Sequence, residues 1–121
     1  MSLTKILLAQ QKRQRKYFEN YVAYARKLKE IVVGRIGDPN IRLLVFGSVV
    51  RGEALPGRSD IDILVISDAV SLSASWQSGI RTDMLLELGD FFSPFEIHFA
   101  TRELYDSWYS RFIGSQYLEI E

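Results

Sequence analysis

Two acidic side chains, Asp60 and Asp62, stand two positions apart in a segment that is otherwise largely apolar. In a β-strand, side chains at this spacing point to the same face, with their Cα atoms about 7 Å apart. At an effective dielectric constant of about 20, two carboxylates at that distance repel each other by about 2.4 kcal/mol. A magnesium ion, or a pair of ions, bridged by both carboxylates would replace this repulsion with attraction. The pair therefore predicts either a divalent-metal site that shares ligands with phosphate or two acids on a solvated strand end.

A Gly47-Ser48 pair follows the apolar run over residues 41–46. Glycine lets the backbone approach a ligand closely, and a helix that starts after a strand offers unpaired N–H groups to an anion. The pair is therefore typical of a phosphate-binding turn, but it also fits an ordinary strand-to-helix turn in which Ser48 caps the helix. The two nearby acids favour the phosphate-binding turn, because magnesium sites commonly include phosphate oxygens.

A third acid, Glu96, lies on the polar face of the alternating segment 95–100. If that segment pairs beside the strand of Asp60 and Asp62, Glu96 completes an acidic triad as a third metal ligand. His98 shares its face, and we interpret it as a partly buried structural histidine or as a partner of a ligand. The chain has no cysteine and this single histidine, which excludes disulfides, thiol nucleophiles and an ordinary structural zinc site. We therefore expect any metal to be held by oxygen.

Hydrophobic periodicity predicts the elements that position these residues. Apolar residues at spacings of three and four predict a long N-terminal helix over about residues 4–34, ended by glycines and a proline. We expect strands over 41–46, 60–66 and 95–100. We expect three further helices, namely a short helix that ends near Gly52, an amphipathic helix over 76–88, and a last helix with Thr101 as its N-cap.

Composition limits the class of protein. The 121 residues, 47% hydrophobic and 25% charged, fit one globular domain. The apolar runs are far shorter than the ~20 residues of a membrane helix, so we expect no membrane contact and a cytoplasmic location. Residues 1–60 hold 12 Lys/Arg and 5 Asp/Glu, whereas residues 61–121 hold 3 and 10. Part of the basic excess, the cluster from Lys12 to Lys16, reads as a solvated helix face, with contact to a phosphate backbone or an acidic partner as the alternative.

The stretch from Gly47 to Val65, G-S-V-V-R-G-E-A-L-P-G-R-S-D-I-D-I-L-V, resembles the signature of the minimal nucleotidyltransferases of the DNA polymerase beta superfamily. The segment 95–100 extends the likeness. The resemblance implies an α+β, polymerase beta-like fold, with helices packed on a small mixed β-sheet and a long N-terminal helix. It also implies a single nucleotidyltransferase domain over residues 1–121, with a catalytic core over about 41–121.

In that family the Gly-Ser element holds the nucleoside triphosphate, and the Asp-x-Asp pair with a third acid holds two magnesium ions. The resemblance implies that the metal ligands and catalytic residues here are Asp60, Asp62 and Glu96. It implies nucleotide binding by Gly47, Ser48, Arg51 and Ser59, although Arg51 has an alternative role in an ion pair that fixes the short helix. Two positions depart from the pattern, since Val49 is often polar in the family and aspartate is common in place of the glutamate.

The activity implied is Mg²⁺-dependent transfer of a nucleoside monophosphate from ATP, or another nucleoside triphosphate, to an acceptor hydroxyl. Glu96 is the candidate general base. Larger relatives carry an extra helical domain that this chain lacks, so the resemblance implies a homodimer or a small helical partner of the HEPN type, a toxin that the chain restrains as antitoxin. One alternative is a non-catalytic nucleotide-binding module that restrains a helical partner by contact. Another is RNA-directed transfer, which only the basic cluster from Lys12 to Lys16 supports.

Overall fold

The computed structural model describes residues 2–121. Its first elements are two helices and two strands, α1 (Leu3–Glu19), α2 (Tyr21–Ile36), β1 (Arg42–Phe46) and β2 (Ile61–Ile66). They are followed by α3 (Ala74–Leu88), β3 (Phe95–Ala100), α4 (Arg102–Leu104), the π-helical turn η1 (Tyr105–Tyr109), α5 (Ser110–Ile113) and β4 (Tyr117–Ile120). None of the helices within residues 2–121 combines the length and the hydrophobicity that a bilayer span requires.

The four strands form one mixed sheet in the order β3-β2-β1-β4. β1 runs antiparallel to β2 and β4, whereas β2 and β3 are parallel. The predicted α+β fold is therefore confirmed, and β3 has the predicted bounds. β4 was not predicted, because only Ile120 of its four residues is buried. One buried residue does not produce the alternation of apolar and polar residues that indicates a strand.

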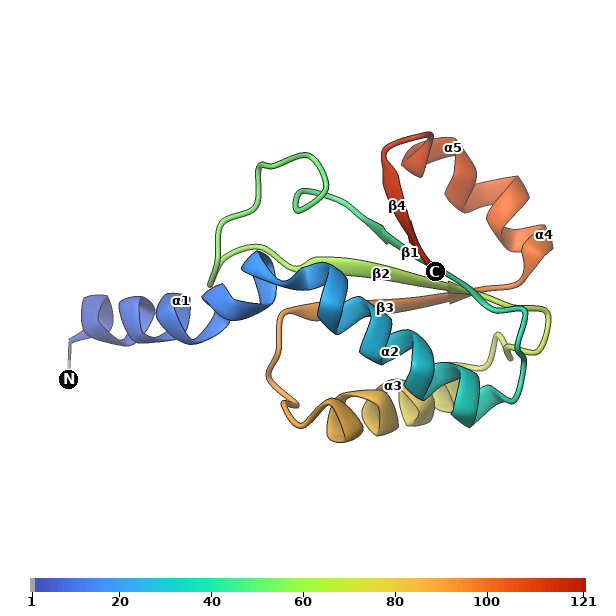
Figure 1. Ribbon diagram of the computed structural model, residues 1–121, viewed down its shortest axis with the longest axis horizontal. Helices are drawn as coiled ribbons and strands as arrows, with labels where there is room; N and C mark the ends of the chain where they lie inside the picture. The colour runs from blue at the N-terminus through green and yellow to red at the C-terminus, as the bar shows by residue number, and fades with distance from the viewer. Residues whose placement is uncertain (1) are drawn as a thin grey trace.

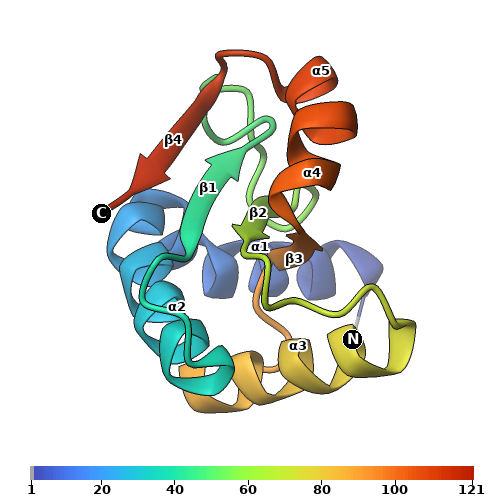
Figure 2. The same ribbon diagram turned by 90° about the vertical axis from the view of Figure 1, so that its right-hand side faces the viewer.

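Helices cover both faces of the sheet, with α2 and α3 on one side and α4, η1 and α5 on the other (Figures 1 and 2). Alternation along β2 divides its side chains between two cores. Ile63 and Val65 pack in the larger core with Leu28 of α2. Leu64 packs in the smaller core, together with Tyr105 of η1. Asp62 shares the parity of Leu64, so it lies on the face that η1 and α5 cover.

The C-terminal half of α1 is the part that anchors this helix to the body. Tyr17 is buried, and its hydroxyl donates to Asp90 Oδ2 at 2.6 Å. Burial and this hydrogen bond raise the pKa of Tyr17, so the side chain stays neutral. Gln14 Oε1 accepts the N–H of Gly57 at 3.2 Å, which ties α1 to the loop before β2. The N-terminal half extends from the body (Figure 1).

The helix predicted over about residues 4–34 is divided at Asn20. Both the backbone N–H of Asn20 and its side-chain Nδ2, at 3.0 Å, donate to the carbonyl of Lys16. An asparagine side chain competes in this way with the backbone, and Asn20 takes a non-helical φ of −124°. A second helix then starts at Tyr21 and ends at Gly37, whose φ is 79°.

The prediction of a short helix after Ser48 is wrong. Residues 47–52 form successive turns, in which the N–H of Val50 donates to Gly47 at 3.2 Å and that of Gly52 to Val49 at 3.3 Å. Gly47 and Gly52 have φ values of 86° and 73°, in the left-handed region, which does not continue a right-handed helix. Any anion-binding N–H groups here therefore belong to a bend and not to a helix start.

Candidate active site

β1 stops at the end of the sheet where β2 and β3 start (Figure 1), and the acidic residues Asp62 and Glu96 lie near these starts. Asp62 of β2 is the register partner of Glu96 on β3 and of Phe46 on β1. Because β2 and β3 run parallel and in register, the side chains of Asp62 and Glu96 stand side by side on one face. The pairing on which the predicted triad depended is therefore present.

Asp60 lies one residue before β2, and its carboxyl is near enough to Glu96 to influence the pKa of that residue. Burial raises the pKa of Glu96, and the imidazole of His98 opposes this effect. The nearby carboxyls of Asp60 and Asp62 raise the pKa of Glu96 further. The surroundings of Glu96 thus disfavour its charged form, and a bound cation would reverse that effect.

His98 belongs to this cluster, a position that suits the second of its two predicted roles, that of a partner of a ligand. Its Nε2 lies 3.5 Å from Asp62 Oδ1 and 3.7 Å from Glu96 Oε1. Ligand atoms of Asp62, Glu96 and His98 lie within 4.8 Å of one another, a spacing that one metal ion can share. The i, i+2 relation of His98 to Glu96 carried this signal, but a lone histidine on an alternating strand usually has a structural role.

The bend at Gly47 packs directly against the carboxylate of Asp62. A Cβ added at Gly47 would collide with Oδ2 of Asp62 and would lie 3.3 Å from its Cγ. The φ of 86° at Gly47 is a second reason why this position needs glycine. The structure therefore brings the Gly47-Ser48 bend and the acids together in one site.

Ser59 and Arg51 make local contacts within the loop between β1 and β2. Ser59 Oγ accepts the N–H of Leu55 at 2.9 Å, and the N–H of Ser59 donates to the carbonyl of Leu55 at 2.8 Å. Arg51 Nε lies 3.1 Å from Glu53 Oε2. These contacts give both residues a part in shaping the loop. For Arg51 this is the ion pair expected as its alternative role, made across a turn and not a helix.

Comparisons with known proteins agree with this geometry. The model of the nucleotidyltransferase domain family matches residues 25–116, which contain the bend, the three acids and His98. A crystal structure of a "putative nucleotidyltransferase" is 27% identical, with a TM-score of 0.50 over 77% of this chain and 92% of that one. Another, of a "putative nucleotidyltransferase from Sulfolobus solfataricus", shares the fold at 19% identity and a TM-score of 0.51, over 93% of this chain and 84% of that one. No curated protein matches the chain.

Proposed function

The chain belongs to the nucleotidyltransferase domain family, and on that premise we propose that it transfers a nucleoside monophosphate from ATP, or another nucleoside triphosphate, to an acceptor hydroxyl. The observation that carries this proposal is the contact of the Gly47 bend with Asp62, which itself stands beside Glu96. A phosphate-binding bend next to paired carboxylates is the arrangement that metal-assisted phosphoryl chemistry needs. We take residues 1–121 as one domain for this activity.

The donor set fits a divalent cation. Asp60, Asp62 and Glu96 offer carboxylate oxygens, which Mg²⁺ prefers, and we propose two Mg²⁺ ions as in the family pattern. The imidazole of His98, 3.5 Å from Asp62 Oδ1, is placed to orient that carboxylate. When bound, the ions would supply Lewis-acid activation of the acceptor hydroxyl and neutralisation of the triphosphate charge.

The protein's own groups supply binding and proton transfer. The N–H groups of Val50, Gly52 and Glu53 bond back onto carbonyls of the bend, so we expect those of Ser48 and Val49 to face the triphosphate. The acceptor oxygen attacks the α-phosphorus, the bond from that phosphorus to the β-phosphate oxygen breaks, and pyrophosphate leaves. Glu96, which stands on the open part of the face, would take the hydroxyl proton.

Labelled ATP tests this proposal. With Mg²⁺ and glycerol as a surrogate acceptor hydroxyl, we expect pyrophosphate release and transfer of label from the α-phosphate but not from the γ-phosphate. Chelation of Mg²⁺ by EDTA should reduce both signals to background, because the carboxylates then lack the cation that the reaction needs. ATP binding without pyrophosphate release would support the non-catalytic module instead. Failure to bind ATP would contradict both functions.

We propose that α1 carries the partner, which is either a second copy of the chain or a small helical protein of the HEPN type that the chain restrains. The helix lies outside the matched residues 25–116, so the family match assigns no role to it. Its N-terminal half exposes four large apolar side chains, Leu3, Ile6, Leu7 and Leu8. Such an unpaired apolar helix face is typical of a surface that binds another helix.

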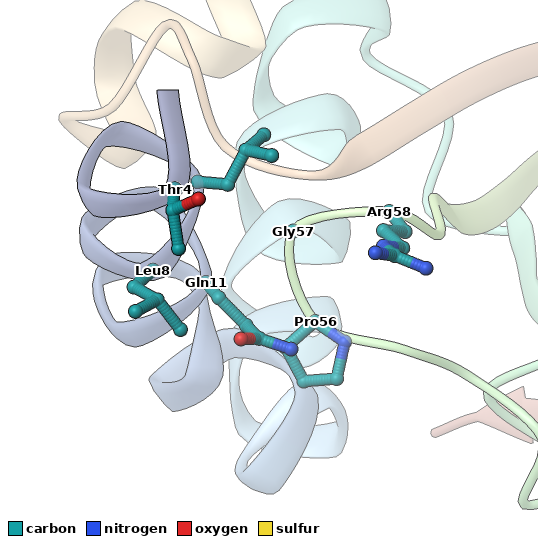
Figure 3. Close-up of a pocket in the computed structure, with 7 residues that line it drawn as sticks. Thr4, Leu8, Gln11, Pro56, Gly57 and Arg58 are labelled. Atoms are coloured by element: carbon teal, nitrogen blue, oxygen red, sulfur yellow. The ribbon is translucent and has the colours of Figure 1, made fainter. Parts of the chain in front are cut away.

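A pocket of about 280 Å³ lies between this helix face and the loop before β2 (Figure 3). Leu8 and Gln11 line it from α1, and Pro56 and Gly57 line it from the loop that leads into Asp60. The loop packs closely there, since a Cβ at Gly57 would lie 3.0 Å from Gln11 Cα. A partner bound at this pocket would therefore touch the segment that positions Asp60.

Leu8→Glu is expected to convert a dimer to a monomer, or to abolish co-purification of the helical partner, because it places a charge in the apolar face. Leu8 is exposed, so the free energy of unfolding should change by less than about 0.5 kcal/mol. Light scattering gives the mass, and Leu72→Glu, at an exposed position before α3, is the matched control. An unchanged mass together with unchanged co-purification would contradict a role for α1.

A further inference from the structure

Aromatic rings border the face of the sheet that carries the acids. They come from the end of β1, from β3 and from the helical segment after β3, and are Phe46, His98, Trp108, Tyr109 and Phe112. Ring centroids of Phe46 lie 5.8 Å from His98 and 6.4 Å from Phe112. Tyr109 lies 6.5 Å from His98 and 5.5 Å from Phe112. The rings thus form one connected set that begins at the acidic cluster; we call it the aromatic border.

The outer members of the aromatic border are exposed, although they are large and apolar. Trp108 and Phe112 are 62% and 59% exposed, and their ring centroids are 6.3 Å apart. Trp108 lies in the π-helical turn η1, which also contains the buried Tyr105 and in which the N–H of Ser110 donates to the carbonyl of Tyr105. Such turns occur frequently at functional sites. Neither ring is needed to fill the core beneath it.

A pocket of about 200 Å³ joins the aromatic border to the bend. Phe46 and Phe112 line it together with Gly47, Arg51 and the exposed Gln116. The same cavity therefore offers flat apolar rings, an amide that can donate and accept hydrogen bonds, and the backbone next to Asp62. This combination fits a planar heteroaromatic group attached to a phosphate chain.

We propose that the aromatic border binds the nucleobase of the triphosphate by stacking, with Phe112 as its principal contact. The inference rests on the proposed function, because the bend at Gly47 is where the triphosphate would lie. A nucleotide held there by its phosphates extends its base into the adjoining pocket, which Phe112 lines. Stacking uses the π-face that every base has, so it favours larger purines over pyrimidines without requiring one particular base.

Two probes separate the base from the phosphates, namely ATP and inorganic tripolyphosphate, each titrated in the presence of Mg²⁺. Phe112→Ala is expected to weaken ATP binding by about tenfold or more and to leave tripolyphosphate binding unchanged. Phe92→Ala is the matched control, because Phe92 is 80% exposed in the loop between α3 and β3 and its ring pairs with Phe91 and with no ring of the aromatic border. That variant should leave both affinities unchanged.

Tryptophan fluorescence gives a second readout. A base next to Trp108 should quench its emission, and tripolyphosphate should not. Trp108→Phe should remove the quench, because the other tryptophan, Trp76, packs on Phe99 in the larger core, on the opposite face of the sheet.

The outcomes distinguish this inference from the proposed function. Equal loss of both ligands in Phe112→Ala, or no loss of either, would overturn the stacking role and leave the phosphate site standing. If Phe112→Ala changed the mass measured by light scattering and kept its affinity for ATP, the stacking role would also be overturned, because the rings would then belong to an interface between protein chains. Wild-type protein that binds neither probe would overturn the proposed function and the inference with it.

Discussion

Asp62→Asn is expected to slow nucleotidyl transfer by about a thousandfold or more while the fold is retained. Asp62 stands beside Glu96, contacts Gly47 and lies 3.5 Å from His98. Losing this charge removes a ligand that would contribute several kcal/mol to the transition state, and each ~1.4 kcal/mol is a factor of ten in rate. Pyrophosphate release measured across a Mg²⁺ titration gives the result.

The same substitution should not destabilise the protein, because it removes one of the charges that raise the pKa of Glu96. Thermal unfolding of the variant checks this point. Asp83→Asn on α3 is the matched control, since it makes the same change of charge on the helix that covers the opposite face of the sheet. A variant Asp62→Asn that keeps activity within tenfold of the wild type would contradict the assignment of Asp62 as a ligand.

Gly47→Ala is expected to reduce activity by about a hundredfold and to lower the free energy of unfolding by about 1–2 kcal/mol. The stability cost comes from the φ of 86°, since a left-handed conformation costs a residue with a Cβ about that much. The loss of activity comes from the new Cβ, which would push the carboxylate of Asp62 out of place. A misplacement of about 1 Å is enough for an effect of about a hundredfold.

Gly52→Ala separates these two causes. Its φ of 73° imposes a similar backbone strain, but an added Cβ there meets no heavy atom within 4 Å. Urea unfolding should therefore show comparable losses of stability in the two variants, whereas Mg²⁺ and ATP affinity should fall only in Gly47→Ala. Equal losses of activity in Gly47→Ala and Gly52→Ala would mean that the bend affects activity through its backbone conformation alone. The contact of Gly47 with Asp62 would then have no effect on activity.

The parts of the site that could be predicted from the sequence depend on short-range alternation. Alternation predicted that Asp62 and Glu96 lie on the polar faces of their strands, as they do. Asp60 was expected in the same strand as Asp62, but it lies one residue before β2. The parallel, in-register pairing of β2 with β3 then brings Glu96 to Asp62. That pairing is a long-range contact, so the sequence supported it only through the resemblance of its motif.

The features that were missed depend on competition between local hydrogen bonds or on partners far along the chain. The side chain of Asn20 takes the carbonyl of Lys16 and interrupts an apolar periodicity that continues across it. Two glycines in the left-handed region replace a helix with turns after Phe46. β4 is held by pairing with β1, and two hydrogen bonds join Glu119 to Arg42, contacts that no local pattern encodes.

The alternation of buried and site-facing side chains along β2 couples the geometry of the site to the fold. Ile61 and Ile63 are fully buried on either side of Asp62, so a slip of one residue along this strand would bury carboxylates and expose isoleucines together. The acids therefore cannot drift by small steps relative to one another. Substitutions that weaken the core should leave each folded molecule fully active and reduce only the fraction of molecules that are folded. The activity of such a variant would therefore report its folded fraction.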